Sequence, residues 1–580
     1  MASVKLEKES PASVQRSKLL TFKEAIRNLL QLTRSCRTPL GKTKILQNTS
    51  GGSMTLTSSS KRLLQSLSVR KPIIQLLVFA TQGHLSAYSD GGLFLASLAS
   101  DLVLRSVDSN QNAKILAEVY ETFLTLSLEY LNSDVCAFKY KAMMSDIKFM
   151  KSFVKSVLGT KSLCQWDKSK LGHISNIVLE TFLQCLSDDS QSMHASDNVF
   201  VMATLGLDML ESKSICGLLL PAPELSKFKV KPLKPKLFVQ AKGRTIKVAL
   251  ITTSLSGDLD ELSGVKYEVS QDISVDTEIL EGLSGFCDSI VQSNVGLVLC
   301  QKVIHPKLKL ILRKSGVIVI DRIGLQLVKY IVKLTDCVPI QSLANSTSEN
   351  SFGHIDDVQH KIVNKMSYLH LTRADNPVST LILYHCQDQP LQELKDVCIT
   401  SLDSFQHLLY TPAVLAGGGC WQVGLSNYLR NKIENEKRKL SEDLECPAST
   451  IQQACTLFRQ ALITAALGEV HSYSVSRHSG HVFSNDDVIG DDDSDDNDGG
   501  GDRYCLCGIY KARKDEELIR LREDEDMCVK TEAGKLPVGD AIEKYDSVVM
   551  DSFSMCVNAL QTSVLTACSV LKIGQVVENL

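Results

Sequence analysis

Three short segments containing glycine have the residue types that could bind phosphate. They are residues 38–41 (TPLG), 89–93 (SDGGL) and 417–419 (GGG). Glycine lets a backbone approach a ligand closely, and a carboxylate can hold Mg²⁺. Taken singly, each segment is better explained as a turn or a loop. In these segments Gly41, Asp90, Gly91, Gly417, Gly418 and Gly419 are the residues whose types could do this chemistry.

A fourth segment, residues 41–43 (GKT), matches only the end of a P-loop. The first glycine of that motif would fall on Cys36. The segment also follows an expected helix, whereas a P-loop follows a strand. We interpret this match as a coincidence.

The eighteen cysteines are scattered through 580 residues without regular spacing. This distribution is typical of buried free thiols in a reducing compartment. Cys505 and Cys507 form a C-x-C pair, but no second pair follows at the spacing of a zinc site. Cys420 has no identifiable base nearby in the sequence, which favours an inert thiol over a nucleophile.

Length and composition indicate a multidomain globular protein. A chain of 580 residues exceeds what one core usually holds, and 44% hydrophobic and 22% charged residues are ordinary values. The net charge of -3 gives no reason to expect a nucleic-acid partner. No apolar run approaches the roughly 18 residues of a membrane span. We therefore expect no nucleic acid and no membrane insertion.

The pattern of apolar residues predicts a helical body interrupted by an α/β layer. Thr21 and Glu24 have the spacing of a capping box. Predicted helices cover 22–32, 61–67, 73–80, 93–107 and 113–131, and later 394–409, 423–439, 451–467 and 548–571. Between these groups, predicted strands at 246–252, 295–300, 317–320 and 338–340 alternate with helices at 278–291, from 306, and at 325–334. This alternation indicates parallel strands.

Residues 485–503 form an acidic, glycine-rich segment with nine aspartates. Such a composition cannot bury apolar surface and predicts a solvated, disordered loop. A calcium loop is excluded because the twelfth position counted from Asp493 is Tyr504, where the motif needs glutamate.

In this order, the three glycine segments resemble the GPxG, GDGTT and GGGA signatures of group II chaperonins, the family of the eukaryotic cytosolic chaperonin. Further matches to that family lie at residues 156–161, 210–219, 294–304, 316–322 and 571–573. Within the family, residues 297–306, 321–324 and 417–420 look most like the McKusick–Kaufman/Bardet–Biedl chaperonin-like branch.

The resemblance implies the fold of a chaperonin subunit, with multidomain α and α/β architecture. Both ends would build a mainly helical equatorial domain, from residues 1–138 and 425–580, the latter with the acidic loop 485–503. An intermediate domain would comprise 139–209 and 365–424. The inserted α/β apical domain, which binds clients in the family, would cover 210–364.

Several family positions for ATP hydrolysis are altered. The family's TNDG segment aligns with residues 57–60 (TSSS), both threonines of GDGTT are absent, and Gln422 replaces an acid. Counting back without gaps places Thr400 at the water-activating aspartate, with Asp396 one helical turn away as a weak catalytic candidate. Threonine is too weakly acidic to act as a base. We therefore expect no efficient enzyme. The resemblance leaves open weak binding of ATP and Mg²⁺ at a vestigial nucleotide site, with Asp90 as the weak candidate for the magnesium ligand. The other residues of that site would be Gly41, Gly91, Gly417, Gly418 and Gly419.

The resemblance also implies a task and partners. The task is assisting assembly of the BBSome, a ciliary trafficking complex whose subunits would be the clients. The partners would be other Bardet–Biedl chaperonin-like proteins and subunits of the cytosolic chaperonin, in the cytoplasm and at the centrosome or basal body. One alternative is an active folding chaperonin that uses Asp396 and Asp90. Another is a nucleotide-dependent α/β enzyme built on residues 245–342, although residues 253–257 lack the G-x-G-x-x-G turn.

Overall fold

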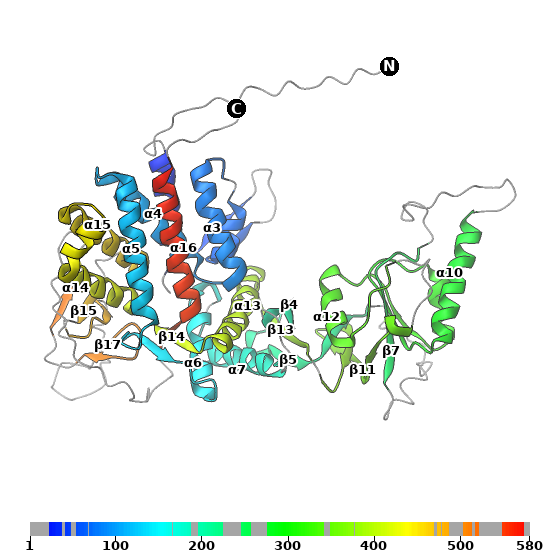
Figure 1. Cartoon of the computed structure of the whole chain (residues 1–580). Coiled ribbons are helices and arrows are strands. Elements are labelled where there is room, and N and C mark those ends of the chain that lie inside the picture. Colours follow the sequence, from blue (N-terminus) through cyan, green and yellow to red (C-terminus); the bar gives the residue numbers. More distant parts are fainter. Residues whose placement is uncertain are drawn as a thin grey trace, which may run out of the picture. The chain divides into compact units, whose positions relative to one another are not determined.

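The chain forms two compact units in the computed structural model, one from residues 1–175 and 387–580 and the other from 176–386 (Figure 1). The structure describes residues 22–37, 41–47, 54–67, 69–164, 166–186, 195–223, 245–256, 275–341, 349–375, 377–468, 473–476, 478–485, 503–512, 517–520 and 548–573. Thr21 of the predicted capping box and residues 486–502 of the predicted acidic loop lie outside these ranges.

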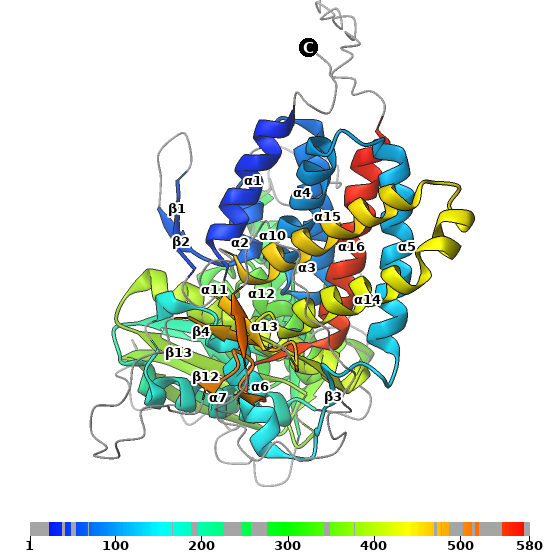
Figure 2. The same ribbon diagram turned by 90° about the vertical axis from the view of Figure 1, so that its left-hand side faces the viewer.

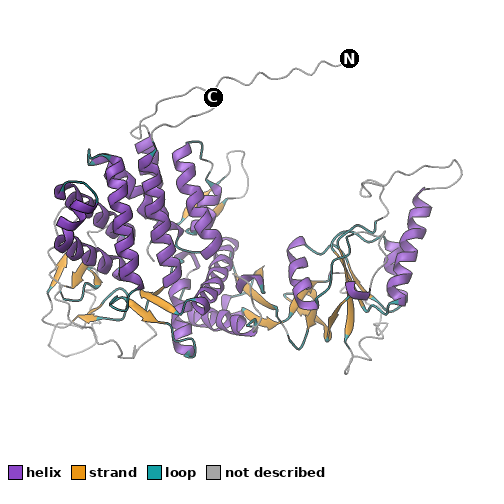
Figure 3. Cartoon of the chain, in the orientation of Figure 1, coloured by secondary structure: helices purple, strands orange, loops and turns teal. Residues whose placement is uncertain are grey.

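The first unit is mainly helical, as the secondary-structure colouring shows (Figure 3). Its helices before the insertion are α1 (Lys23–Ser35), α2 (Ser60–Ser66), α3 (Pro72–Tyr88), α4 (Gly92–Asp108), α5 (Ala113–Asn132) and α6 (Ile147–Leu158); α7 (Lys168–Gln184) crosses the boundary between the units. Those after it are α13 (Asp388–Tyr410), α14 (Cys420–Asp443), α15 (Ala448–Leu467) and α16 (Phe553–Lys572).

Helix α4 is the centre of this unit. Nearly every residue from Phe94 to Leu104 is buried, which is typical of a core helix without a solvent face. The helix packs against α1 and α3 from the same end of the chain and against α15 and α16 from the other end (Figures 1 and 2). The hydrophobic core is therefore shared between both ends of the sequence.

Helix α16 corrects the expectation that no segment is long and apolar enough to span a membrane. By length and hydropathy it passes that test, but 56% of the apolar window is buried in the fold. The buried side chains, such as Leu560 and Val564, belong to the core shared with α4 and α5. This burial is typical of a core helix in a globular unit.

Short strands complete the first unit. The central β14 (Ala413–Ala416) pairs antiparallel with β3 (Lys139–Lys141) and β20 (Met550–Ser552). The helix predicted to begin at 548 therefore begins at Phe553, because the residues before it are paired as a strand. Further short strands are β1 (Lys44–Leu46), β2 (Thr55–Thr57), β15 (Tyr473–Ser476), β16 (Val482–Ser484), β17 (Arg503–Tyr504), β18 (Lys511–Ala512) and β19 (Leu518–Arg520).

The second unit contains the predicted α/β layer. Strands β7 (Ile246–Ile251), β8 (Leu297–Cys300) and β9 (Ile318–Ile320) are parallel, and β10 (Gly353–Ile355) joins β7 antiparallel. The layer's helices are α10 (Val275–Gln292), α11 (Pro306–Lys314) and α12 (Leu325–Thr335). The strand predicted at 338–340 is reduced to one bridge between Ile340 and Ile251.

Two further sheets in this unit were not predicted. In one, β12 (Met366–Thr372) lies between β11 (Asp357–Val363) and β6 (Leu218–Pro221). In the other, β13 (Ser379–His385) pairs parallel with β4 (Val199–Leu205) and antiparallel with β5 (Lys213–Cys216). The expected fold class, a helical body with an inserted α/β region, is confirmed. The five predicted domain segments and their boundaries stay predictions.

An aromatic cluster joins the two ends of the chain in the first unit. Phe458 of α15 lies with its ring centroid 5.7 Å from that of Tyr120 and 5.9 Å from that of Phe123, both on α5. All three side chains are fully buried. The cluster therefore fixes α15 against α5.

Phe458→Ala should lower the free energy of unfolding of the first unit by about 3–5 kcal/mol, because a large buried ring is replaced by a cavity. Urea denaturation followed by far-ultraviolet circular dichroism measures this change. Phe79→Ala is the matched control, since that ring is 63% exposed and its loss should leave stability nearly unchanged. Equal effects of the two substitutions would contradict the packing of α15 on α5.

Candidate nucleotide site

Asp90 lies in the turn between α3 and α4. Ser89 and Gly91 on either side of it have positive φ values of 61° and 80°, which reverse the chain direction. The Gly91 N–H donates to Asp90 Oδ1 at 2.7 Å, and the Asp90 carbonyl oxygen lies 2.8 Å from Nε2 of His84. A Cβ at Gly91 would lie 2.5 Å from Met555 Sδ on α16, and the positive φ also disfavours any residue with a side chain here.

The triple glycine connects β14 to α14. The Gly417 N–H donates to the Val549 carbonyl at 2.9 Å. Gly418 has a φ of 63°, and a Cβ there would lie 2.7 Å from the backbone of Leu506. One turn later, Trp421 Nε1 donates to Asp551 Oδ2 at 3.2 Å. The triple glycine is therefore packed between two other segments of the chain.

A cluster of three charged residues, Arg37, Asp90 and Asp551, lies between these turns. Burial and then the Asp90 charge raise the pKa of Asp551 to about 6. Burial lowers the pKa of Arg37 to about 10, against the opposing effect of Asp551 and Asp90. The guanidinium carbon lies 5.2 Å from the ring centroid of Phe94. Arg37 Nη1 is buried, and the described part of the chain offers it no hydrogen-bond acceptor.

Gly41 belongs to the same neighbourhood. A Cβ at this position would lie 2.4 Å from the carbonyl oxygen of Cys36 and 2.7 Å from that of Arg37. The structure thus places Gly41 beside the backbone of Arg37, and the triple glycine beside the segment that carries Asp551. Their roles as nucleotide ligands stay predictions.

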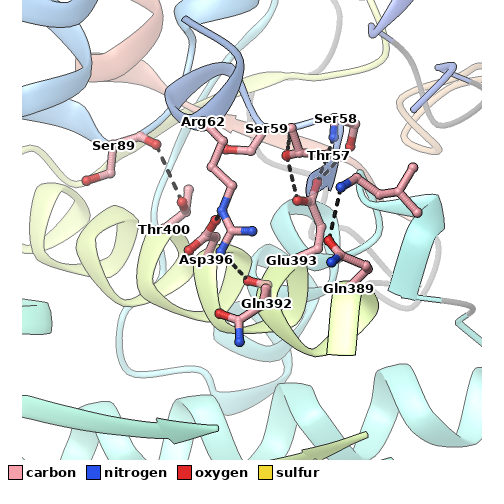
Figure 4. A network of polar contacts seen from close by, with 11 residues as sticks. Thr57, Ser58, Ser59, Arg62, Ser89, Gln389, Gln392, Glu393, Asp396 and Thr400 are labelled. Carbon is pink, nitrogen blue, oxygen red and sulfur yellow. Dashed lines mark hydrogen bonds and ion pairs between the residues drawn. The ribbon is translucent and has the colours of Figure 1, made fainter. Parts of the chain in front are cut away.

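The α13 positions expected to activate water make contacts within the protein (Figure 4). Asp396 forms an ion pair with Arg62 of α2. Burial raises the pKa of the Asp396 carboxyl, and Arg62 opposes this effect. Thr400 lies one turn further along α13, with Oγ1 3.4 Å from the Ser89 carbonyl oxygen. Of these two candidates, Thr400 contacts the Asp90 turn and Asp396 is held by Arg62.

Glu393 is an acidic residue that the sequence analysis missed. Its fully buried carboxylate accepts hydrogen bonds from Thr57 Oγ1 at 2.7 Å, Ser58 N at 3.0 Å and Ser58 Oγ at 2.9 Å (Figure 4). These donors belong to the TSSS segment that replaces the family's TNDG. The Glu393 carboxylate on α13 therefore holds the TSSS segment in place, although the segment itself contains no acidic residue.

Arg37, Asp403 and Asp551 were missed as well. Asp403 is buried on α13 and accepts a hydrogen bond from Ser89 Oγ at 2.7 Å. None of these residues belongs to a glycine motif, so spacing gave no signal. Asp403 lies on α13 between the buried apolar residues Leu402 and Phe405, and this acidic residue among apolar ones was the available signal.

Comparison with known families shows which family the chain belongs to. The model of the TCP-1/cpn60 chaperonin family matches residues 29–466, which is more than half of the chain. The chain belongs to this family. It is similar to "Molecular chaperone MKKS" of Pongo abelii and of Homo sapiens, at 29% and 28% identity over 99% of each chain.

An archaeal chaperonin is a more distant relative. "Thermosome subunit alpha" of Sulfurisphaera tokodaii is 23% identical over 69% of this chain and 71% of the thermosome subunit. The thermosome and MKKS matches confirm both the expected group II chaperonin family and the resemblance to its McKusick–Kaufman branch.

Asp551→Asn should stabilise this chaperonin-family chain at neutral pH. Because the folded pKa of about 6 exceeds the ordinary value of 3.8, the folded state takes up a proton more readily than the unfolded state. The charged carboxylate therefore destabilises the fold above pH 6 and has no such effect near pH 4. We expect a gain of about 1–2 kcal/mol at about pH 7.5 that disappears near pH 4.

Urea denaturation at both pH values measures this effect. The amide oxygen of the new Asn can still accept the Trp421 N–H, so packing is conserved. Asp443→Asn, at an exposed position of α14, is the control and should change nothing at either pH. A loss of stability at neutral pH in Asp551→Asn would show instead that the charged carboxylate is needed to balance Arg37.

Proposed function

We propose that this chain is a chaperonin-like subunit that works in a mixed complex and whose ATP hydrolysis is lost or weak. One observation carries the second part of this proposal. The two α13 positions expected to activate water are Thr400, which is not a base, and Asp396, which is paired with Arg62.

A general base must reach the proton of the attacking water with a free lone pair. Asp396 could take that role only after breaking its ion pair with Arg62, in a site where the carboxylate is already poorly solvated. Losing such a group slows a reaction by roughly 10²–10⁴-fold. The pairing of Asp396 with Arg62 therefore supports the proposal that hydrolysis is lost or weak.

The charges around Asp90 support the same proposal. The positive charge near Asp90 and Asp551 comes from Arg37 of the protein itself, where a chaperonin ATPase would use Mg²⁺. Gln422, which replaces the family acid, has a buried Oε1 without a hydrogen-bond donor among the described residues. The buried Nη1 of Arg37 and the glycine turns are the features that support residual nucleotide binding.

Purified full-length protein should release phosphate from ATP no faster than Asp396→Ala, and both should be at background. A colorimetric phosphate assay with saturating Mg²⁺ measures the rates, and an archaeal thermosome is the positive control. A wild-type rate well above background that Asp396→Ala removes would establish the alternative, an active folding chaperonin.

The first part of the proposal rests on similarity to the proteins named molecular chaperone MKKS. We propose that the chain assists assembly of the BBSome together with other Bardet–Biedl chaperonin-like proteins and cytosolic chaperonin subunits, in the cytoplasm and at the centrosome or basal body. We propose that exposed apolar side chains of the second unit bind the clients. On α11, Leu308 and Leu312 pack into the core, whereas Leu310 is 54% exposed.

The alternative of a dinucleotide-binding enzyme has less support. In such folds the ligand binds beyond the carboxyl ends of parallel strands. In this chain, backbone hydrogen bonds connect the segment that follows β7 to the segment that follows β8. The Leu255 N–H donates to the Val303 carbonyl at 2.9 Å, and the His305 N–H donates to the Leu255 carbonyl at 2.8 Å. This backbone pairing lies where a dinucleotide would have to enter.

Size-resolved co-purification from ciliated cells, with mass spectrometry of each fraction, tests the assembly role. We expect the chain to migrate with chaperonin subunits and BBSome subunits. Leu310→Ser should reduce recovery of the BBSome subunits at least several-fold and retain the chaperonin subunits. Ile362→Ser, at a 69% exposed position of β11, is the matched control. Recovery of the chain only as a free monomer would contradict the assembly role.

A further inference from the structure

Four side chains of the types that bind metal ions meet in the first unit. They are Cys420, His481, Cys505 and Cys507, and their donor atoms all lie within 4.8 Å of one another. None of the four is more than 4% exposed. No second cysteine pair follows Cys507 at the spacing of a zinc site, so the sequence did not indicate zinc. Folding supplies the two missing ligands, Cys420 and His481, from other segments.

Three separate elements bring these side chains together. Cys420 is the first residue of α14, directly after the triple glycine. His481 precedes β16 in the hairpin formed with β15. Cys505 and Cys507 lie in the turn between β17 and β18. The sulfurs of Cys505 and Cys507 lie 2.8 Å apart, and Cys507 Sγ lies 3.3 Å from His481 Nδ1.

The surroundings hold the ligands in position. The Tyr510 N–H donates to Cys505 Sγ at 3.2 Å, a contact that favours a thiolate at this sulfur. The imidazole of His481 stacks on the Tyr510 ring at 5.0 Å between centroids and packs beside Phe138 at 5.2 Å. The backbone of the turn is also fixed, because the Leu506 N–H donates to the Val482 carbonyl at 2.7 Å.

We propose that these four side chains bind one Zn²⁺ ion as a structural Cys₃His site. Three thiolates and one imidazole are the donors that tetrahedral zinc prefers, and such sites are closed to substrate. Burial of all four ligands leaves no open position for a reaction. Two thiolates bound to one zinc at about 2.3 Å lie about 3.8 Å apart, so binding moves the sulfurs of Cys505 and Cys507 apart by about 1 Å.

Two alternatives to a zinc site, a disulfide bond and a group of metal-free thiols, explain fewer of these contacts. The separation of 2.8 Å between Cys505 and Cys507 is longer than a disulfide bond of about 2.0 Å. A disulfide between them would also leave the convergence of Cys420 and His481 without a role. Metal-free thiols would place three weakly polar groups and an imidazole in a volume shielded from water, with few hydrogen bonds to compensate.

The four-ligand site lies next to the triple glycine and to the segment that carries Asp551. Leu506, between the two cysteines, is the residue whose backbone occupies the space beside Gly418. The Val549 N–H donates to the Cys507 carbonyl at 2.9 Å, and the Val549 carbonyl accepts the Gly417 N–H. Zinc would therefore fix the 505–510 turn against the triple glycine and against the strand that carries Asp551. This inference does not depend on the proposed function.

Metal analysis of the full-length chain, purified under reducing conditions from zinc-supplemented cells, tests the proposal. We expect about one zinc per chain, and a strong chelator should lower the thermal unfolding temperature. Cys507→Ser should lose most of the zinc. Cys287→Ser, which changes an equally buried free cysteine on α10, should retain about one.

Cobalt substitution tests the ligand set even if Cys507→Ser fails to fold. Wild type loaded with Co²⁺ should show thiolate-to-cobalt charge transfer and the intense visible bands of a tetrahedral centre. His481→Cys keeps four ligands and should still bind one metal ion, with a shifted cobalt spectrum, whereas Cys287→Ser should match wild type. Absence of zinc and of a tetrahedral cobalt spectrum in wild type, or a Cys505–Cys507 disulfide in the thiol-blocked protein, would overturn the proposal.

Discussion

The packing of α4 against helices from both ends of the chain is the contact on which the rest of the structure depends. Because α1 and α3 cover one part of α4 and α15 and α16 cover another, the core closes only when distant segments meet. This packing aligns the turn at Asp90, which begins α4, with the β14–α14 turn and with β20. The positions of the candidate nucleotide-site residues therefore depend on the packing of helices around α4.

Around the candidate site, several charged side chains already interact with other groups of the protein. Arg37 lies near Asp90 and Asp551, Arg62 pairs with Asp396, and Glu393 binds the TSSS segment. A carboxylate that already has a cation or several donors gains less from binding a metal ion. These contacts hold the altered segments in place within a chaperonin-family fold.

The sequence predicted the features that depend on local pattern. The apolar, β-branched strands β7, β8 and β9 and the amphipathic α1 could be recognised because their periodicity is intrinsic to the segment. The start of α16 was placed five residues early because residues 548–552 are as apolar as the helix that follows. The sequence did not reveal the roles of Glu393, Asp551 and the Cys420–His481 pair. Each of these residues interacts with a partner that is dozens to hundreds of positions away along the chain.

The late position of α16 has a consequence for how the protein is made. This helix supplies apolar partners for α3, α4 and α5, yet it ends only at residue 572 of 580. While a ribosome synthesises the preceding 552 residues, the first helices have no surface on which to complete their core. Nascent chains therefore expose apolar surface of α3, α4 and α5 until α16 is made, and a stop codon before α16 would remove a helix that packs on all three.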